Sequence, residues 1–280
     1  MTITPHSRPV ALVTGAGRNI GRAIALALAH SGHAVAVNVR SSVSEGRAVV
    51  DEITARGGAA LLCVADVADQ AAVDAMVARI GLHFGRLDVL VNNAAVRHDA
   101  ELATLSVHDW QATLRVILDG AFFCTQAALR WLKAAPAGAI VNIGGIANIT
   151  SLPLRGDVIG FDCGPGNVLL DGWIRRHRGL DYDADGAWAN TGKVLPGMLE
   201  RLLGDAYFNR PPPKSTGRDL FHLDWMQPAL DGDERPVDVQ ATLLELTAAR
   251  AAAPAVTETP REQPPVAEMP LAEMPPEPPI

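Results

Sequence analysis

Residues 10–29 determine which fold class this chain can adopt. They read Val10-Ala-Leu-Val-Thr-Gly-Ala-Gly-Arg-Asn-Ile-Gly21, followed by Arg22-Ala-Ile-Ala-Leu-Ala-Leu-Ala29. A short apolar run, a turn rich in glycine and a run of strong helix formers predict a strand, a tight turn and a helix. Glycine lets the backbone approach a diphosphate closely, and the helix N-terminus stabilises the charge of that group. The sequence therefore predicts a dinucleotide site at the start of an α/β fold.

Apolar runs of strand length recur through the first half of the chain and alternate with helical segments. The further runs cover residues 33–38, 59–64, 87–91 and 139–143. Near-continuous apolar strands that alternate with helices are typical of a parallel sheet covered on both faces. We expect an incomplete Rossmann-type parallel sheet in residues 1–144, here called the front half.

The front half resembles the short-chain dehydrogenase/reductase family in three motifs. They are Thr14-Gly-Ala-Gly-Arg-Asn-Ile-Gly21, Asp66-Val67 and Asn92-Asn-Ala-Ala95. Asn19 stands where the family usually has its middle glycine, and Ile117 stands where many members have a catalytic asparagine. The resemblance implies binding of a nicotinamide dinucleotide. The implied cofactor-binding residues are Thr14, Gly15, Gly17, Arg18, Asn19, Ile20, Gly21, Arg40, Asp66, Val67, Asn92 and Ala94.

The charges near the second expected strand predict which dinucleotide binds. A carboxylate at the end of that strand would accept a hydrogen bond from the ribose 2′-hydroxyl and favour NAD. Residues 38–42 contain no carboxylate, whereas Arg40 and Arg18 suit a 2′-phosphate. We therefore expect NADP, with NAD as the alternative. The competing interpretation is that both arginines are solvated surface residues.

The proton-transfer pair of that family, Tyr-x-x-x-Lys, is missing. The chain has two tyrosines, Tyr182 and Tyr207, and the residues four positions later are Gly186 and Pro211. Without a cation one helical turn away, the pKa of a tyrosine is not drawn down toward neutral pH. We assign no catalytic residue.

Motifs of a different kind begin near residue 142. Residues 142–150 form an apolar run around a Gly-Gly pair, which predicts a hairpin that a ligand can approach. Gly160-Phe-Asp-Cys-Gly-Pro-Gly-Asn167 predicts a fixed loop that presents amides or the Asp162 carboxylate to a phosphate or a sugar. Residues 168–174 predict the start of a helix.

Two further groups of charged residues follow. Asp183 and Asp185 could form a metal loop, but we favour a solvated turn and predict no metal site. Lys214 and Arg218 flank Ser-Thr-Gly and suit either an anionic substrate or a helix cap.

These motifs resemble anhydro-N-acetylmuramic acid kinase, a family of the actin/hexokinase-like ATPase superfamily. The resemblance continues through Asp238-Val-Gln-Ala-Thr242 and fades near Ala249, with Cys163 in place of the usual threonine. It implies a fragment of an ATPase lobe in residues 145–253, here called the rear half. The implied ligand-loop residues are Gly144, Gly145, Asn148, Asp162, Gly164, Gly166, Asn167, Lys214 and Arg218.

Parts that this second family uses for ATP are not found in the sequence. Its phosphate loop and catalytic aspartate lie upstream of the Gly-Gly hairpin, where this chain has dehydrogenase-like sequence. Its adenosine motif should follow Thr242 and is absent. Phosphoryl transfer depends on all of these parts for positioning and charge stabilisation, so we do not expect ATP binding.

The join between the two resemblances falls inside residues 140–145, without a linker. A fusion of two domains usually has a polar linker and two complete domains, so this join is typical of recombination, misassembly or splicing. Three functions remain open. They are an NADP-binding hybrid without a complete active site, an NADP-dependent oxidoreductase of a carbonyl or alcohol with an unrecognised acid, and a kinase whose missing parts come from another chain.

Composition sets the class of protein and of partner. The chain has 280 residues and a net charge of −7, which argues against a nucleic-acid or anionic-membrane partner. We find no secretory signal and no apolar run of about 18 residues. Cys63, Cys124 and Cys163 lack metal-ligand spacing and fit reduced thiols in the cytoplasm. Residues 254–280, rich in proline, are expected to be disordered.

Overall fold

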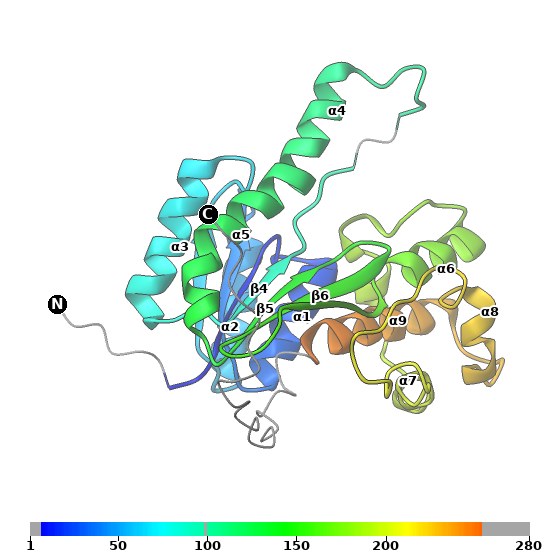
Figure 1. Cartoon of the computed structure of the whole chain (residues 1–280). Coiled ribbons are helices and arrows are strands. Elements are labelled where there is room, and N and C mark those ends of the chain that lie inside the picture. Colours follow the sequence, from blue (N-terminus) through cyan, green and yellow to red (C-terminus); the bar gives the residue numbers. More distant parts are fainter. Residues whose placement is uncertain (1–6, 98–99, 254–280) are drawn as a thin grey trace, which may run out of the picture.

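In a computed structural model, which describes residues 7–97 and 100–253, one seven-stranded sheet runs through both halves of the chain (Figure 1). The expected disordered tail, residues 254–280, lies outside the described residues. The strand order is β3-β2-β1-β4-β5-β6-β7. The strands are β1 (Val10–Val13), β2 (Ala34–Val39), β3 (Ala60–Val64), β4 (Val89–Asn92), β5 (Ala137–Asn142), β6 (Ile146–Pro153) and β7 (Ile159–Pro165).

The first five strands form the parallel sheet that the sequence predicts. The pairs β2–β3, β1–β2, β1–β4 and β4–β5 are all parallel. Every side chain of β1 and β2 is buried, as expected for strands covered on both faces. The helices of this half are α1 (Asn19–His30), α2 (Val43–Ala55), α3 (Gln70–Phe84), α4 (Val107–Leu114) and α5 (Gly120–Ala134).

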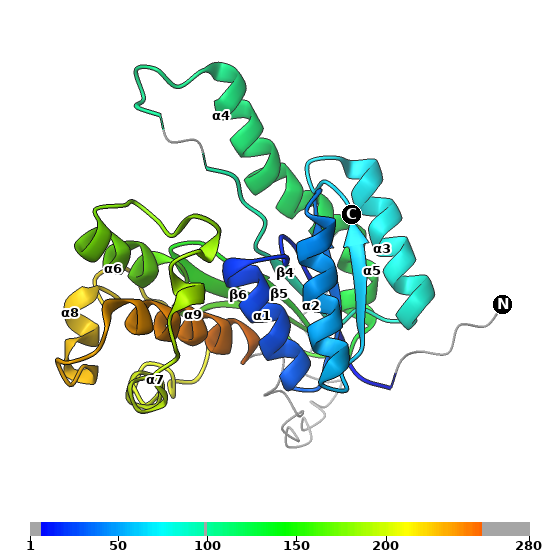
Figure 2. The same ribbon diagram turned by 180° about the vertical axis from the view of Figure 1, so that it is seen from behind.

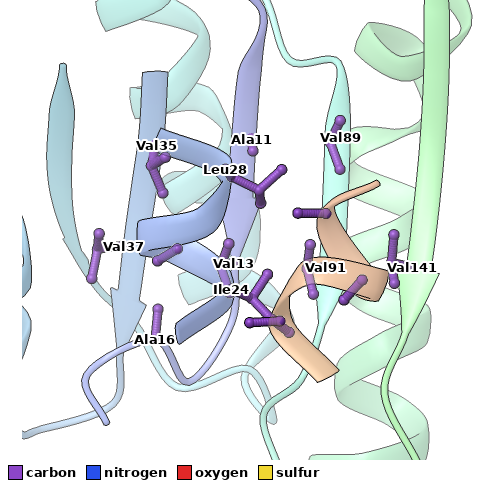
Figure 3. Close-up of a cluster of buried hydrophobic side chains, with 14 of the residues drawn as sticks. Ala11, Val13, Ala16, Ile24, Leu28, Val35, Val37, Val89, Val91 and Val141 are labelled. Carbon is purple, nitrogen blue, oxygen red and sulfur yellow. The ribbon is translucent and has the colours of Figure 1, made fainter. Parts of the chain in front are cut away.

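Two apolar layers cover the two faces of this sheet. On one face, Ile24 and Leu28 of α1 lie over Val13, Val37 and their neighbours (Figure 3). On the other face, α3 and α5 cover the sheet with apolar side chains such as Ile80 and Leu132. Alternating side chains of each strand therefore enter opposite layers, as the strand geometry requires.

The rear half extends the same sheet with antiparallel strands. β5 pairs with β6, and β6 pairs with β7, which confirms the hairpin predicted at the Gly-Gly pair. The loop predicted for residues 160–167 is wrong, because residues 159–165 form β7. Phe161 and Cys163 alternate with polar or small residues and pack against the layer under α1, which is the periodicity of a strand.

Helices of the rear half enclose a third apolar core. They are α6 (Val168–Arg178), α7 (Pro196–Leu203), α8 (Leu223–Met226) and α9 (Pro236–Ala252), and α6 begins where the sequence predicts a helix. Tyr207, Phe208 and Phe221 belong to this core, and their rings contact one another. The last turns of α9 leave this core, and Ala248 and Ala252 join the layer under α1 (Figures 1 and 2).

A long helix projects from the body of the molecule (Figures 1 and 2). It joins α4, the π-helix η1 (Arg115–Asp119) and α5 into one helix of 28 residues, Val107–Ala134. No side chain of α4 or η1 is buried. In the described part of the chain it is the one helix long and apolar enough to cross a membrane, by length and composition alone.

This helix corrects the expectation that no segment is apolar over a membrane-spanning length. The expectation concerned an uninterrupted apolar run, whereas this helix is interrupted by charged residues such as Arg115 and Asp119. One side of α5 packs on the sheet through Cys124, Ala128 and Leu132. That packing is typical of a helix that covers a sheet, so length and composition do not by themselves assign a membrane span.

Exposed apolar side chains on the projecting helix predict concentration-dependent self-association. Trp110 is 53% exposed, Leu118 63% and Phe122 58%. Neighbouring exposed apolar side chains promote contact between molecules. The double variant Trp110→Glu/Leu118→Glu should associate less than the unsubstituted chain in light scattering across a concentration series. Leu82→Glu on α3, where one leucine is 71% exposed, is the matched control and should change nothing. A chain that stays monomeric at all concentrations would contradict this prediction.

Candidate functional site

The turn between β1 and α1 is held against the end of β4 by the Thr14 hydroxyl. This hydroxyl donates to the Val91 carbonyl at 3.1 Å and accepts from the backbone N–H groups of Asn93 and Ala94 at 2.9 and 3.0 Å. Thr14 is 2% exposed. The fold therefore brings together the expected site residues Thr14 and Ala94. Asn93, the other N–H donor to this hydroxyl, is 79 positions from Thr14 in the sequence.

Two asparagine side chains fix the same turn from both sides. The Asn93 amide donates to the carbonyls of Thr14 at 2.9 Å and Gly15 at 3.3 Å. The Asn38 side chain accepts from the Gly15 N–H at 3.3 Å and donates to the Ala65 carbonyl at 3.0 Å. Neither asparagine was among the expected site residues. Each asparagine lies at or just after the end of a buried strand. Polar residues in that position are the sequence signal from which this role could have been predicted.

The backbone of the turn requires its glycines. Gly15 has φ +63°. A Cβ on Gly21 would lie 2.3 Å from the Gly15 carbonyl oxygen and 2.5 Å from the Asn93 amide nitrogen. Asn19, where the family has its middle glycine, also has a positive φ of 50°, and asparagine tolerates that conformation better than most residues. The first turn of α1 therefore lies directly against the glycine turn.

A diphosphate fits this arrangement. Arg18 precedes α1 and makes no side-chain capping hydrogen bond. The first N–H groups of a helix have no partner within the helix, and the helix dipole favours an anion there. The glycines let this turn pack closely on β4, since a Cβ on Gly15 would lie 3.1 Å from the Ala94 Cα. These are the contacts that a dinucleotide requires of a strand, turn and helix.

The two arginines expected to bind a 2′-phosphate have different surroundings. In the described residues Arg40 is exposed and has no ion pair. Arg18 lies 3.1 Å from the Asp185 carboxylate and 3.7 Å from the Glu45 carboxylate. Arg18 is therefore not simply a solvated residue.

Glu45 is a carboxylate that the sequence analysis missed. It lies in the first turn of α2, outside residues 38–42, and the helix turn brings it back toward the glycine turn. Its Oε2 is buried without a hydrogen-bond partner, 3.4 Å from the position that a Cβ on Gly17 would take. The environment of the expected 2′-phosphate site therefore contains negative as well as positive charge.

The remaining cofactor-binding residues also follow strand ends. Asp66 accepts the Ala68 N–H at 2.9 Å in the turn after β3, and Val67 is buried. The Asn92 amide donates to the Asn142 side chain at 3.0 Å, and the Asn142 amide donates to Asn148 at 3.2 Å. Asparagines of β4, β5 and β6 are thus linked across the join between the two halves.

Neither tyrosine forms the Tyr-x-x-x-Lys pair of the family, although the Lys214 amino group lies 4.8 Å from the centroid of the Tyr207 ring. Tyr207 is 1% exposed, its hydroxyl donates to the Asp162 carbonyl at 2.8 Å, and burial raises the pKa of Tyr207 to about 12. The Arg97 guanidinium lies over the Tyr182 ring, 4.5 Å from its centroid. Ile117, in place of the catalytic asparagine, lies in the π-helix and is 47% exposed.

The Gly-Gly turn of the rear half packs against residues 166–167. The N–H groups of Gly166 and Asn167 donate to the carbonyls of Gly145 and Gly144, both at 2.9 Å. A Cβ on Gly145 would lie 3.7 Å from the Arg218 guanidinium and 3.9 Å from the Asn167 side-chain oxygen. Gly144, Gly145, Gly166, Asn167 and Arg218 therefore form one group. Gly164 is separate from it, in β7 beside Phe208.

A second group surrounds a cavity of about 300 Å³ beside β6 and β7. The cavity is lined by Asn148, Ile149, Thr150, Gly160, Phe161, Asp162, Lys214 and Ser215. Asp162 accepts from the Thr216 N–H at 2.8 Å and from the Ser215 hydroxyl at 3.1 Å. Lys214 donates to the carbonyls of Tyr207 and Phe208 at 3.0 and 3.1 Å. Lys214 thus holds backbone carbonyls of a turn, and does not cap a helix as one expectation had it.

The expectation of a solvated turn at Asp183 and Asp185 is partly wrong. Asp183 is 8% exposed, because its carboxylate accepts from the N–H groups of Trp188 and Ala189 at 2.9 and 2.8 Å. Asp185 remains largely exposed and pairs with Arg18. Backbone N–H groups that need an acceptor explain the burial of the first carboxylate.

Two family models match the chain. The model described as short chain dehydrogenase matches residues 9–155, and the model described as anhydro-N-acetylmuramic acid kinase matches residues 122–266. Each covers more than half of the chain, and their overlap contains β5 and the Gly-Gly turn. The predicted combination of two resemblances is confirmed, and the overlap includes residues 140–145, where the sequence places the join.

Curated relatives similar to this chain are anhydro-N-acetylmuramic acid kinases. The relative from Nitrosomonas europaea is 61% identical over 108 residues, which are 39% of this chain and 30% of the relative. Another, from Cupriavidus metallidurans, is 44% identical over 207 residues, covering 66% of this chain and 54% of the relative. The chain thus spans from about a third to about half of the length of these relatives.

Solved structures similar to the chain include short-chain dehydrogenases. One, from Burkholderia cenocepacia in complex with NADP, is 40% identical, covers 50% of this chain and 56% of that chain, and has a TM-score of 0.47. A 3-ketoacyl-ACP reductase from Sinorhizobium meliloti is 40% identical, with coverages of 49% and 54% and a TM-score of 0.47.

Substitution of Gly21 tests the close approach of α1 to the glycine turn. Gly21→Ala should lower the free energy of unfolding by about 1–3 kcal/mol, because the new Cβ would overlap a backbone carbonyl. Gly197→Ala is the control, since a Cβ on this helical glycine meets its nearest atom at 3.6 Å. It should leave stability unchanged or raise it by about 0.5–1 kcal/mol. Denaturant unfolding measures both variants, and equal stabilities would contradict the geometry.

Proposed function

We propose that this chain binds a nicotinamide dinucleotide through its front half, because it belongs to both the short chain dehydrogenase family and the anhydro-N-acetylmuramic acid kinase family. The observation that carries the proposal is the glycine turn, which Thr14 and Asn93 hold against the end of β4. The N-terminus of α1 has no side-chain cap, although residues 183–186 lie against Asn19. That is the position in which a helix accepts a diphosphate.

NADP is the proposed dinucleotide. Arg40 is exposed at the end of β2 and, among the described residues, has no carboxylate partner that would compete with a phosphate. Guanidinium groups bind phosphate in a bidentate geometry. Glu45 argues for NAD as the alternative, because a carboxylate near the ribose accepts hydrogen bonds from its hydroxyls.

We further propose that neither family's reaction is complete in this chain. Dehydrogenase chemistry of this family needs a tyrosine whose pKa is lowered by a lysine, whereas burial raises the pKa of Tyr207 to about 12. The rear half, residues 145–253, is proposed as a fragment of an actin/hexokinase-like lobe, without the phosphate loop and catalytic aspartate of the kinases. The three described cysteines are buried free thiols, which fits a reducing cytoplasm.

Two alternatives keep one activity each. As an oxidoreductase of a carbonyl or alcohol, the chain would use Tyr182 as the acid. Arg97, which follows β4, places its guanidinium over the Tyr182 ring. Tyr182→Phe would then abolish turnover. As an anhydro-N-acetylmuramic acid kinase, the rear half would need its missing parts from another chain, and activity would appear only in a mixture.

Dinucleotide binding without turnover is the first prediction of this proposal. NADPH fluorescence should saturate with the unsubstituted chain. Gly15→Val should abolish the signal, because a side chain at φ +63° is strained and would press on Ala94, which displaces the turn. Arg40→Ala should weaken NADPH binding about tenfold and NADH binding less, since one charge-assisted contact to phosphate is lost.

The control for these variants is Arg155→Ala, an exposed residue beyond the end of β6. It should bind both dinucleotides as the unsubstituted chain does. Carbonyl-dependent oxidation of NADPH at ordinary enzyme rates would overturn the part of the proposal that excludes turnover. If Gly15→Val binds NADPH as tightly as the unsubstituted chain, the glycine turn is not the binding site of the dinucleotide.

The second prediction is that the chain alone does not phosphorylate 1,6-anhydro-N-acetylmuramic acid. The family's general base is replaced by dehydrogenase sequence, and loss of a general base costs about 10²–10⁴-fold in rate. Asp162 does not replace it, because its carboxylate already accepts hydrogen bonds from Ser215 and Thr216. ADP release is the measurement. A signal that depends on the sugar and disappears in Asp162→Asn would refute the prediction.

A further inference from the structure

A segment of the rear half lies on the glycine turn of the front half. The Asn19 amide donates to the Asp183 carbonyl at 3.3 Å, and the Cβ that Gly186 lacks would lie 3.1 Å from Asn19. Arg18 pairs with Asp185 at 3.1 Å. Residues 183–186, here called the covering segment, thus contact the two residues at which α1 begins.

The covering segment is held as a preformed turn. Both carboxylate oxygens of Asp183 accept backbone N–H groups, those of Trp188 and Ala189. Asp185 and Gly186 have positive φ values of 59° and 67°. The Asp185 side chain contacts Arg18 and is otherwise largely open to solvent, with 62% of its surface exposed.

The charges around Arg18 oppose the binding of a phosphate. One guanidinium faces two carboxylates, Glu45 at 3.7 Å and Asp185 at 3.1 Å, so the local sum is one negative charge. The Asp185 carboxylate forms its ion pair with Nη2 of Arg18, the nitrogen to which a bound anion could otherwise pair. A phosphate that approaches Arg18 must displace this carboxylate or bind beside it.

We propose that Asp185 competes with the 2′-phosphate of NADP for Arg18 and that the covering segment must move off the glycine turn when NADP binds. This inference rests on the proposed function of the front half. It makes Asp185, from a segment of kinase ancestry, the residue that limits selection of NADP over NAD. Removal of its charge should strengthen NADP binding, because the repulsion disappears and Arg18 is released.

Paired titrations test this assignment on the full chain. Asp185→Asn should bind NADPH about three- to tenfold more tightly than the unsubstituted chain at low ionic strength, as expected for one surface charge pair. Its affinity for NADH, which lacks the 2′-phosphate, should change less than about twofold. Asp181→Asn is the matched control, since Asp181 pairs with Arg175 at 3.0 Å and not with Arg18.

Hydrogen exchange provides a readout independent of affinity. Saturation with NADPH should speed exchange of the Trp188 and Ala189 amides, whose hydrogen bonds to Asp183 hold the covering segment together.

The outcomes separate this inference from the proposed function. If the unsubstituted chain binds NADPH but Asp185→Asn binds it no more tightly and exchange is unchanged, the competition is refuted while the proposed function stands. Binding that appears only in Asp185→Asn supports both. If neither form binds any dinucleotide, both the proposed function and this inference are overturned.

Discussion

The structure depends on the use of both edges of β5. Ala139 pairs with Val89 of β4 on one side and with Ser151 of β6 on the other. The first pairing is parallel and belongs to the dehydrogenase half, whereas the second is antiparallel and belongs to the kinase half. Buried backbone N–H and C=O groups need partners, so a rear half that did not pair here would leave an open edge in the middle of the fold. The shared strand removes that edge.

Helix α9 provides the second connection between the halves. A parallel sheet needs helices on both faces, and α1 and α2 cover only part of one face. Ala248, Ala251 and Ala252 of α9 complete that layer with small side chains. Figure 3 shows the ribbon of α9 beside Val91 and Val141. The same helix contributes Val239, Leu243 and Leu246 to the aromatic core of the rear half. One helix therefore belongs to both apolar cores and couples their stability.

Much of the front half could be predicted from the sequence, because its signals are local. The apolar run of β1, the glycine turn and the helix formers of α1 lie within 21 residues and need no distant partner. The contacts of Asn93 with Thr14 and Gly15 could not be predicted in this way, since they join residues about 78 positions apart. Glu45 was missed for a related reason. Its carboxylate returns to the glycine turn only through the geometry of α2.

The rear half was harder to predict where a short segment has features of both a loop and a strand. Glycines and a proline in residues 160–167 favour a loop, but the alternation of Phe161 and Cys163 toward the core favours the strand that forms. No local pattern in either half predicts the ion pair between Asp185 and Arg18. It arises only because the rear half folds back over α1, so neither family's motifs could reveal it.

This chain combines two ancestries, and we expect it to bind a nicotinamide dinucleotide but not ATP. Calorimetric titration of the same purified chain with NADPH and with ATP tests this most directly. The glycine turn with its uncapped helix predicts saturable heat with NADPH. Because we expect the phosphate loop of the kinases to be missing, we predict no saturable heat with ATP. Saturable binding of ATP, or no binding of NADPH, would contradict the account.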